Sequence, residues 1–437
     1  MAATAGAAVG MGNLWKFSAL AGSNGGAAFV AVYLACVLLM SLPVLIAEVV
    51  IGSRGRANPV AATVSLAREA HVSSGWQVIG WLGCITGLLI LSYYSIFGGI
   101  GLFYIGDVFA GSYESLTALD VGQRFNAVLE QELVLIQWHS IFLAIVVLVV
   151  SLGVELGLAR LSRFILPVLL LMLVALVAFS LHQGDADQAL HFLFAFDVAS
   201  ISPEIVVAAM GQAFFTLSIG LGAMMAFGAY LPDGRSVMGM LSIVVLIDTV
   251  VAILAGLAIF PLVFSAHIEP GMGPGLMFVA LPYAFSHIEY GEYFGSFFFI
   301  MVSLVALGSG VALLEPAVAW LVERFRWYRF YAAALIGFLV WLLGVLALFS
   351  FNRWSEVRYW DMTIFGLLDF TTANLLLPFS GLLIAFFVGW QLRMEVVRDE
   401  FYRQTGWLFQ LWYGLLRFVA IPAIIIIMWV PLYRQWL

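Results

Sequence analysis

The chain has 437 residues, of which 64% are hydrophobic and only 10% are charged, and its formal net charge is −7. A water-soluble domain carries about a quarter charged residues, so this composition excludes an ordinary soluble protein and indicates lipid as the main solvent. Both cysteines, Cys36 and Cys84, lie inside apolar runs and are interpreted as packing residues, because neither has a disulfide or metal-site pattern. The six histidines are scattered without metal spacing, so we expect no catalytic constellation, no enzyme activity and no nucleic-acid partner.

About eleven apolar segments follow one another along the chain, each long enough for a membrane helix at roughly 20 residues per span. They lie near residues 1–20, 26–51, 76–109, 135–154, 160–182, 203–229, 237–265, 293–323, 330–350, 363–392 and 410–434. The first segment is short and interrupted. The pattern predicts an all-α, multi-pass membrane protein with lipid around it.

Arginines concentrate in alternate loops between these segments. One set of loops contains Arg54, Arg56, Arg68, Arg160, Arg163, Arg235, Arg324, Arg326, Arg329, Arg393, Arg398 and Arg403, and the other contains Arg124, Arg353, Arg358 and Arg434. Positively charged loops stay in the cytoplasm. We therefore predict an inner (plasma) membrane protein with its N-terminus in the cytoplasm and its C-terminus outside.

Two of the segments are interrupted by the same short glycine pattern. The first reads Val9-Gly10-Met11-Gly12, and the sixth reads Ile219-Gly220-Leu221-Gly222, about half the chain away. Matched breaks in two halves point to the binding site of a repeat-built transporter, since freed backbone groups at membrane depth need a ligand, an ion or water. Close helix packing by small residues is the alternative reading.

The residues around both breaks resemble the signatures of the neurotransmitter:sodium symporter family. The likeness runs in order through residues 8–17 (AVGMGNLWKF), 24–29 (NGGAAF), 211–218 (GQAFFTLS), 248–252 (DTVVA), 255–256, 259–261, 274–282 (PGLMFVALP), Ser309 and 313–316 (LLEP). It implies the leucine-transporter fold, with about eleven transmembrane helices and with helices 1 and 6 broken. The implied units are a 5+5 inverted repeat, 1–182 and 203–393, and an additional C-terminal helix at 410–437. The implied function is sodium-coupled import of an amino acid by alternating access.

Family resemblance also implies the substrate site, between the two breaks. Its residues would be Ala7, Ala8, Gly10, Met11, Gly12, Ile90, Tyr94, Phe215, Thr216, Ser218, Leu221, Ser309 and Leu313. The substrate carboxylate would meet the N–H groups near Met11 and Gly12 and the Tyr94 hydroxyl, since a half-helix start attracts an anion. Amine transporters of the family carry an aspartate where this chain has Gly10, which favours an amino acid. Small residues in the pocket leave room for a larger apolar or aromatic side chain. For Tyr94, simple packing is the alternative.

Two sodium sites are implied in the same way. The first would use Ala8, Asn13, Thr216 and Asp248, and the second would use Gly6, Val9, Val305 and Ser309. Oxygen ligands suit a hard cation, and an ionisable residue inside a span is a functional candidate, although Asp248 could also be a paired structural carboxylate. The second site lacks an oxygen at Gly308, which leaves the sodium stoichiometry open. Asp248 supplies a negative charge and Ala252 lacks a hydroxyl, so chloride is not expected to be required.

Gate residues follow from the same resemblance. Lys16 and Asp369 match the outer gate, with Tyr94 and Phe215 beneath them, and Glu323 matches the inner gate. A lysine makes a point-charge contact, so a looser pair is expected; Lys16 could instead snorkel outward from a helix end. The usual arginine partner of Glu323 has no counterpart, because Met1 lies only five residues before Gly6. Impaired closure to the cytoplasm is therefore expected.

Rival functions remain open at this level. A transport-deficient amino-acid sensor or regulatory membrane protein would keep the same fold and binding site. A channel fits less well, since two broken helices around a gated pocket suit stoichiometric binding. The sequence does not indicate which amino acid is bound or what oligomer forms.

Overall fold

The computed structural model describes residues 6, 9–153, 157, 160–231, 236–271, 273, 275–401 and 406–436, with side chains up to residue 433. Nine helical segments within this part are long and apolar enough to cross a membrane. They are Ala27–Gly55, Ser74–Phe109, Glu132–Ser151, Arg160–Gln183, Val237–Ser265, Gly291–Phe325, Arg329–Phe351, Ile364–Gln391 and Trp407–Tyr433. They confirm the second to fifth and the seventh to eleventh predicted spans.

Both remaining predicted spans are the broken ones, and their pieces are short. The first consists of a π-helical turn, η1 (Gly12–Lys16), continued by α2 (Phe17–Ser23). The sixth consists of α11 (Pro203–Thr216) and α12 (Ala223–Gly228). Between α11 and α12 the chain takes left-handed backbone angles at Ser218, Gly220 and Gly222 (φ 53°, 83° and 72°), which ends one helix and starts the next. The predicted interruption of helices 1 and 6 is therefore confirmed.

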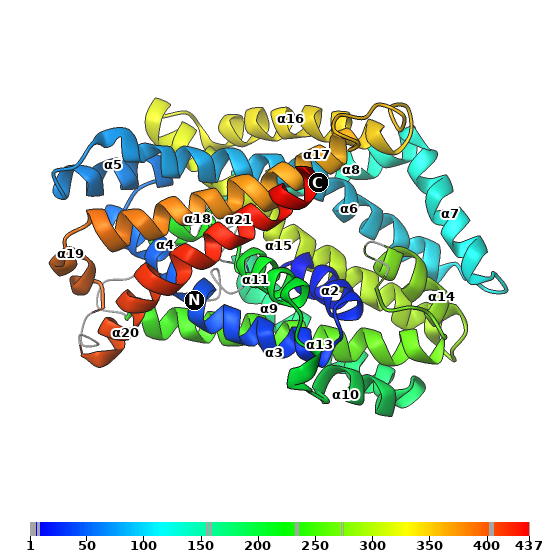
Figure 1. Cartoon of the computed structure of the whole chain (residues 1–437). Coiled ribbons are helices and arrows are strands. Elements are labelled where there is room, and N and C mark those ends of the chain that lie inside the picture. Colours follow the sequence, from blue (N-terminus) through cyan, green and yellow to red (C-terminus); the bar gives the residue numbers. More distant parts are fainter. Residues whose placement is uncertain are drawn as a thin grey trace.

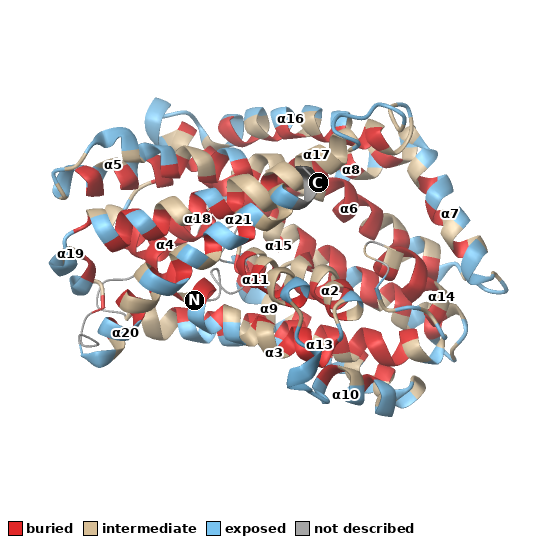
Figure 2. Cartoon of the chain, in the orientation of Figure 1, coloured by how far each residue is buried: buried red, intermediate tan, exposed pale blue. Residues whose placement is uncertain are grey.

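Two long helices form the centre of the molecule. These are α6 (Val78–Phe109) and α15 (Gly291–Phe325), which pack along each other and bury most of their side chains. Figure 2 shows buried residues concentrated on the central helices and exposed ones on the peripheral helices and loops. The peripheral helices α8 (Glu132–Ser151), α9 (Arg160–Gln183) and α21 (Ile421–Trp436) expose large apolar side chains instead. An apolar outer surface is what a lipid solvent requires.

Short helices mark the two ends of the bundle (Figure 1). At one end lie α5 (Pro59–Glu69), α19 (Met394–Asp399) and α20 (Trp407–Leu415), and at the other lie α7 (Ala118–Glu130) and α14 (Leu281–Ser286). We call these the inner and the outer end, after the orientation that the arginines predict.

The remaining long segments carry the residues discussed below. The second span joins α3 (Ala27–Cys36) to α4 (Leu42–Gly55) through a π-helical turn, η2 (Val37–Ser41). The seventh is α13 (Val237–Ser265) and the ninth is α16 (Arg329–Leu348). The tenth joins α17 (Ile364–Phe370), η8 (Thr371–Leu376), α18 (Leu377–Phe386) and η9 (Phe387–Gln391). The eleventh joins α20 to α21 through η10 (Leu416–Ala420).

Candidate functional site

A cavity lies where the two breaks meet, between α6 and α15. Its walls come from both broken helices and from the two central helices: Gly10, Met11, Gly12, Asn13, Ile90, Tyr94, Phe215, Thr216, Ser218, Leu221, Ala223, Ser309, Ala312 and Leu313. The structure thus brings together every predicted substrate residue that it describes. Ala7 and Ala8 lie outside the described residues.

Two polar atoms in this cavity lack a hydrogen-bond partner among the described residues. They are the hydroxyl oxygens of Tyr94, on α6, and Ser309, on α15, and both are buried. A buried polar group without a partner costs roughly 1–3 kcal/mol. Beside them η1 begins at Gly12, and the first turn of a helix presents N–H groups that have no intrahelical acceptor. This wall is therefore suited to an anionic group such as a carboxylate.

The same cavity also has apolar lining. Ile90, Leu221 and Leu313 are among its wall residues, and α6 and α15 approach each other closely beside them at Gly87. A Cβ on Gly87 would lie 3.2 Å from the carbonyl oxygen of Leu313, so a larger residue there would push α15 away. The cavity therefore offers both polar and apolar contacts, as a zwitterion with an apolar side chain requires.

Three polar residues meet beneath the first break. Asn13, Thr216 and Asp248 come from η1, α11 and the middle of α13, and at most 3% of any of them is exposed. The Asn13 amide donates to the Asp248 carboxylate (2.8 Å), to the Asp248 carbonyl (3.2 Å) and to the Thr216 hydroxyl (3.0 Å). Thr216 donates to the other Asp248 oxygen (3.1 Å). Carboxylate, carbonyl and hydroxyl oxygens of Asp248 and Thr216 thus converge around the Asn13 amide nitrogen, while the Asn13 amide oxygen accepts from the backbone N–H of Gly10 (2.9 Å). Oxygens of these kinds are the ligands that a hard cation prefers.

Sequence reasoning missed two polar neighbours of this cluster. The Tyr33 side chain, on α3, is fully buried close to Thr216 and Asp248, and its hydroxyl makes no hydrogen bond with the described residues. Gln212 donates to the carbonyl of Gly12 (3.1 Å), while its amide oxygen has no partner in the described chain. Both are polar residues inside apolar helices, and that signal could have singled them out.

The residues predicted for a second cation site also approach one another. A Cβ on Gly308 would lie 3.2 Å from the carbonyl oxygen of Gly6, so position 308 faces the start of the first helix. The neighbouring Ser309 hydroxyl has no partner in the described chain, and Val305 is buried on the same helix. Gly308 contributes no oxygen, as the sequence indicates.

Glu48 is a further residue that sequence reasoning missed. This fully buried glutamate on α4 accepts hydrogen bonds from the backbone N–H groups of Gly220 (2.8 Å) and Gly222 (3.2 Å). It thereby satisfies the amides that the second break exposes. An ionisable residue in the middle of an apolar run was its signal.

At the outer side, Lys16 and Asp369 line one cavity of about 380 Å³ that lies next to the cavity between the two breaks. Five residues line both cavities, and the aromatic Tyr94 and Phe215 are among them, so their rings lie where the two cavities adjoin. The Lys16 ammonium lies 3.9 Å from the centroid of the Phe215 ring. In the described chain no ion pair within 4.0 Å joins Lys16 to Asp369, and the ammonium lies over the Phe215 ring instead, so the predicted gate pair is not in direct contact in this structure.

At the inner side, Glu323 has a partner that the sequence did not suggest. Its carboxylate accepts from the backbone N–H of Asn58 (3.1 Å) and from the Asn58 side chain (2.6 Å). The Asn58 side-chain oxygen in turn caps α5 by accepting from two backbone N–H groups. Nearby, the Arg56 guanidinium donates to the carbonyl of Leu231. Glu323 is therefore bonded to the loop before α5.

Known proteins resemble this chain along almost its whole length. The model of the sodium:neurotransmitter symporter family matches residues 1–115 and 118–435. The uncharacterized sodium-dependent transporter YhdH of Bacillus subtilis is 33% identical over 428 residues, which cover 97% of this chain and 94% of the relative. An uncharacterized sodium-dependent transporter of Haemophilus influenzae is 29% identical, with coverages of 98% and 94%. The crystal structure of MhsT in complex with L-phenylalanine superposes with a TM-score of 0.89 at 37% identity, covering 97% of this chain and 96% of that one.

Proposed function

Because the chain belongs to the sodium:neurotransmitter symporter family, we propose that this sodium-coupled membrane transporter imports an amino acid. One observation carries the proposal. The polar cluster of Asn13, Thr216 and Asp248 lies next to a cavity whose Tyr94 and Ser309 hydroxyls have no partner in the described chain. Cation and substrate would therefore bind in contact, which is what coupling requires.

The proposed substrate is an amino acid with a large apolar or aromatic side chain. Its carboxylate would bind at the N–H groups of the first break and at Tyr94, and its side chain would pack against Ile90, Leu221 and Leu313. Gly10 supplies no acid that could replace a missing substrate carboxylate. The structural neighbour MhsT was crystallised with L-phenylalanine, which is an amino acid of this class.

The proposed ion use is one sodium ion at Asp248 and no requirement for chloride. Asp248 carries its negative charge at the cluster, and the buried Ala252, one turn further along α13, has no oxygen to offer an anion. A second sodium ion would bind weakly at the site near Gly6 and Ser309, since Gly308 has no side-chain oxygen and the site therefore lacks one ligand. Substituting Gly308→Ser would add that oxygen and steepen the sodium dependence of uptake.

Alternating access would connect the two sides of the membrane. Sodium and substrate stabilise a closed outer gate at Lys16, Asp369 and Phe215, after which the helices that carry both breaks tilt and open the inner side. The proposed setting is the inner membrane, with the N-terminus in the cytoplasm. Reporter fusions to the C-terminus, active only outside, would test the orientation.

Uptake into proteoliposomes tests the function. The purified chain is reconstituted, a sodium gradient is imposed, and a panel of labelled amino acids is offered with chloride or with gluconate. We expect sodium-dependent accumulation of aromatic and large aliphatic amino acids in both salts, and none in the Asp248→Ala variant. Binding without accumulation would indicate a sensor, and ungated conductance would indicate a channel; either result overturns the proposal.

A further inference from the structure

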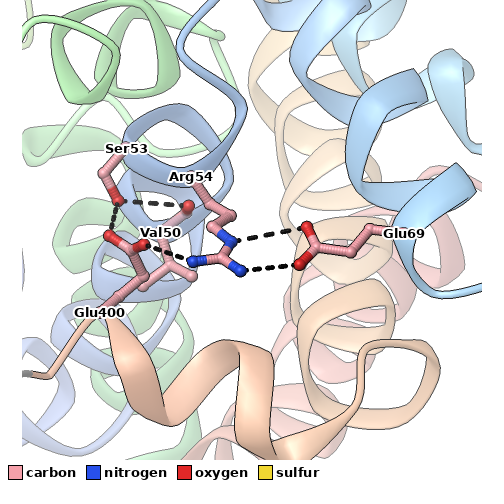
Figure 3. Close-up of polar contacts among 5 residues, drawn as sticks. All are labelled: Val50, Ser53, Arg54, Glu69 and Glu400. Carbon is pink, nitrogen blue, oxygen red and sulfur yellow. Dashed lines mark hydrogen bonds and ion pairs between the residues drawn. The ribbon is translucent and has the colours of Figure 1, made fainter.

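A polar network at the inner end joins the consecutive helices α4 and α5 to Glu400, which is distant from both in the sequence (Figure 3). Ser53, on α4, donates to the Glu400 carboxylate (2.7 Å), and the Arg54 guanidinium lies 3.9 Å from the other oxygen of the same carboxylate. Arg54 also pairs with Glu69 of α5 through two contacts (2.7 and 3.4 Å). Figure 3 shows Arg54 between the two glutamates, with Ser53 on the Glu400 side.

Glu400 belongs to a segment that is itself firmly packed. We call residues 392–401 the α19 linker, because they follow the tenth span and contain α19. Phe401, fully buried, packs against Phe409 (ring centroids 5.0 Å apart) and Trp412 (4.6 Å) of α20. Glu400 is therefore held in place by its neighbour, and its side chain has little freedom to follow a moving partner.

The same assembly holds α4 at a second point. The Trp412 indole donates to the carbonyl of Pro43, at the start of α4, while Glu400 holds Ser53 and Arg54 near its end. Ten residues of helix span about 15 Å, so the contacts of α20 and of the α19 linker with α4 lie near its two ends. A helix held at both ends can tilt only if one of these contacts breaks.

Midway between the two contacts, α4 holds the second break. Glu48 lies five residues from each contact, and it accepts the N–H groups of Gly220 and Gly222. A tilt of α4 therefore acts directly on the break that forms one wall of the substrate cavity. The ion pair between Arg54 and Glu69 also connects α4 to α5, which packs against the central helix α6.

We propose that Glu400 is a positioning residue for transport: through Ser53 and Arg54 it holds α4, and with it the second break, in the inner-closed conformation. This inference rests on the proposed transport function. Release of the Glu400 contacts would accompany inner opening. Because the side chains of Arg54 and Glu400 are 33% and 18% exposed, the network contributes modestly, and its loss should shift the conformational equilibrium about three- to five-fold.

Hydrogen exchange of the full chain in lipid nanodiscs tests the proposal, with sodium chloride or potassium chloride as the only added ligand. Glu400→Gln removes the charge, and Glu395→Gln is the matched control, because Glu395 lies exposed on α19 and makes no hydrogen bond or ion pair with the described residues. We expect Glu400→Gln to raise exchange about three- to five-fold at residues 217–224, far from the substitution, in sodium. Glu395→Gln should leave this segment unchanged.

Two further variants keep the test decisive. Ser53→Ala removes the hydroxyl that donates to Glu400 and should raise exchange at the same segment. Its effect should be less than additive with that of Glu400→Gln, since both variants weaken the attachment of Glu400 to α4. If Glu400→Gln fails to fold, Ser53→Ala takes its place. Faster exchange confined to the α19 linker, or equal profiles for Glu400→Gln and Glu395→Gln, would overturn the positioning role. Exchange in the wild type that sodium does not alter would count against the proposed function instead, so the two failures are distinguishable.

Discussion

The outer and inner ends of the molecule are closed by different kinds of contact. At the outer end Phe278 lies among four aromatic rings, those of Phe97, Tyr104, Phe125 and Phe299, with centroid distances of 5.3 to 6.3 Å. At the inner end, beside the aromatic rings of Phe401, Phe409 and Trp412, directional hydrogen bonds and ion pairs join Glu323 to Asn58 and Arg54 to Glu69 and Glu400. Ring contacts tolerate sliding, whereas hydrogen bonds weaken steeply with misalignment. We therefore expect the outer end to close gradually during transport and the inner end to open and close in a single all-or-none step.

One ion pair supports the aromatic outer end. Arg124 of α7 contacts Asp107, near the end of α6, through two hydrogen bonds (2.6 and 3.3 Å), and the Tyr113 hydroxyl donates to the same carboxylate (2.6 Å). The hydrogen bond with the Asp107 carboxylate raises the pKa of Arg124 above its already high ordinary value. This guanidinium therefore stays charged, and α7 stays fastened to α6 at any physiological pH.

The largest effect is expected at Glu48, which lies between the two ends and holds the second break. Glu48→Gln replaces a carboxylate that accepts two backbone N–H groups by an amide with one acceptor oxygen, so one buried donor loses its partner. We expect sodium-driven L-phenylalanine uptake to fall by more than about ten-fold, since an unpaired buried donor costs roughly 1–3 kcal/mol. Initial rates in proteoliposomes measure this. Glu132→Gln, at a half-buried position at the start of α8, is the control; equal rates in both variants would refute the role of Glu48.

Breaking the inner contact should come next. Asn58→Ala removes one hydrogen bond to Glu323 and the cap of α5, so we expect about a ten-fold lower steady-state accumulation, with a smaller loss of initial rate, because sodium would leak inward. Asn58→Ser keeps a hydroxyl that can cap α5 but loses the amide that donates to Glu323, so it separates the effect of the cap from that of the Glu323 contact. Full accumulation in both variants would show that the inner end does not depend on this contact.

Strengthening the outer gate should have a smaller effect. Lys16→Arg introduces a planar fork that can bind the Asp369 carboxylate with two hydrogen bonds, which the ammonium does not do. We expect about a three-fold higher apparent affinity for the substrate from outside, measured by the concentration dependence of initial uptake. Lys16→Met keeps the length of the side chain and its contact with Phe215 without the charge, and should lower the affinity. Identical affinities in the two variants would contradict a gating role for the charge.

The smallest effect is expected from the ion pair at α7. Arg124→Gln breaks the pair with Asp107, and because the arginine side chain is 39% exposed the loss of stability should be about 1 kcal/mol or less. A lower melting temperature in detergent, by a few degrees, is the measurement. The difference from the wild type should narrow at high salt, since exposed charges are screened; a difference that is independent of salt would point to packing instead.

The sequence predicted most of the fold and the composition of the substrate cavity. In the described chain, nine apolar runs form long helices and two glycine runs interrupt helices at the expected places. Eleven of the residues predicted for the substrate site line one cavity. Hydropathy and helix-breaking glycines are local properties, so they can be read along the chain. The partners of these residues could not be predicted, because Glu48 and Asn58 meet theirs across 172 and 265 positions of the chain.

The sequence by itself therefore determined which solvent surrounds the chain, where the helices lie and where two of them break, because lipid forces every other backbone group into a helix. The tertiary structure alone decided which partners the polar groups have. Glu48 accepts from the backbone N–H groups of the second break, Asn58 donates to Glu323, and the Lys16 ammonium contacts the Phe215 ring and not Asp369. These choices depend on the distances between packed helices, which no single segment encodes. The same packing decides that hydrogen bonds and ion pairs hold Glu323 and Arg54 at the inner end, whereas ring contacts surround Phe278 at the outer end.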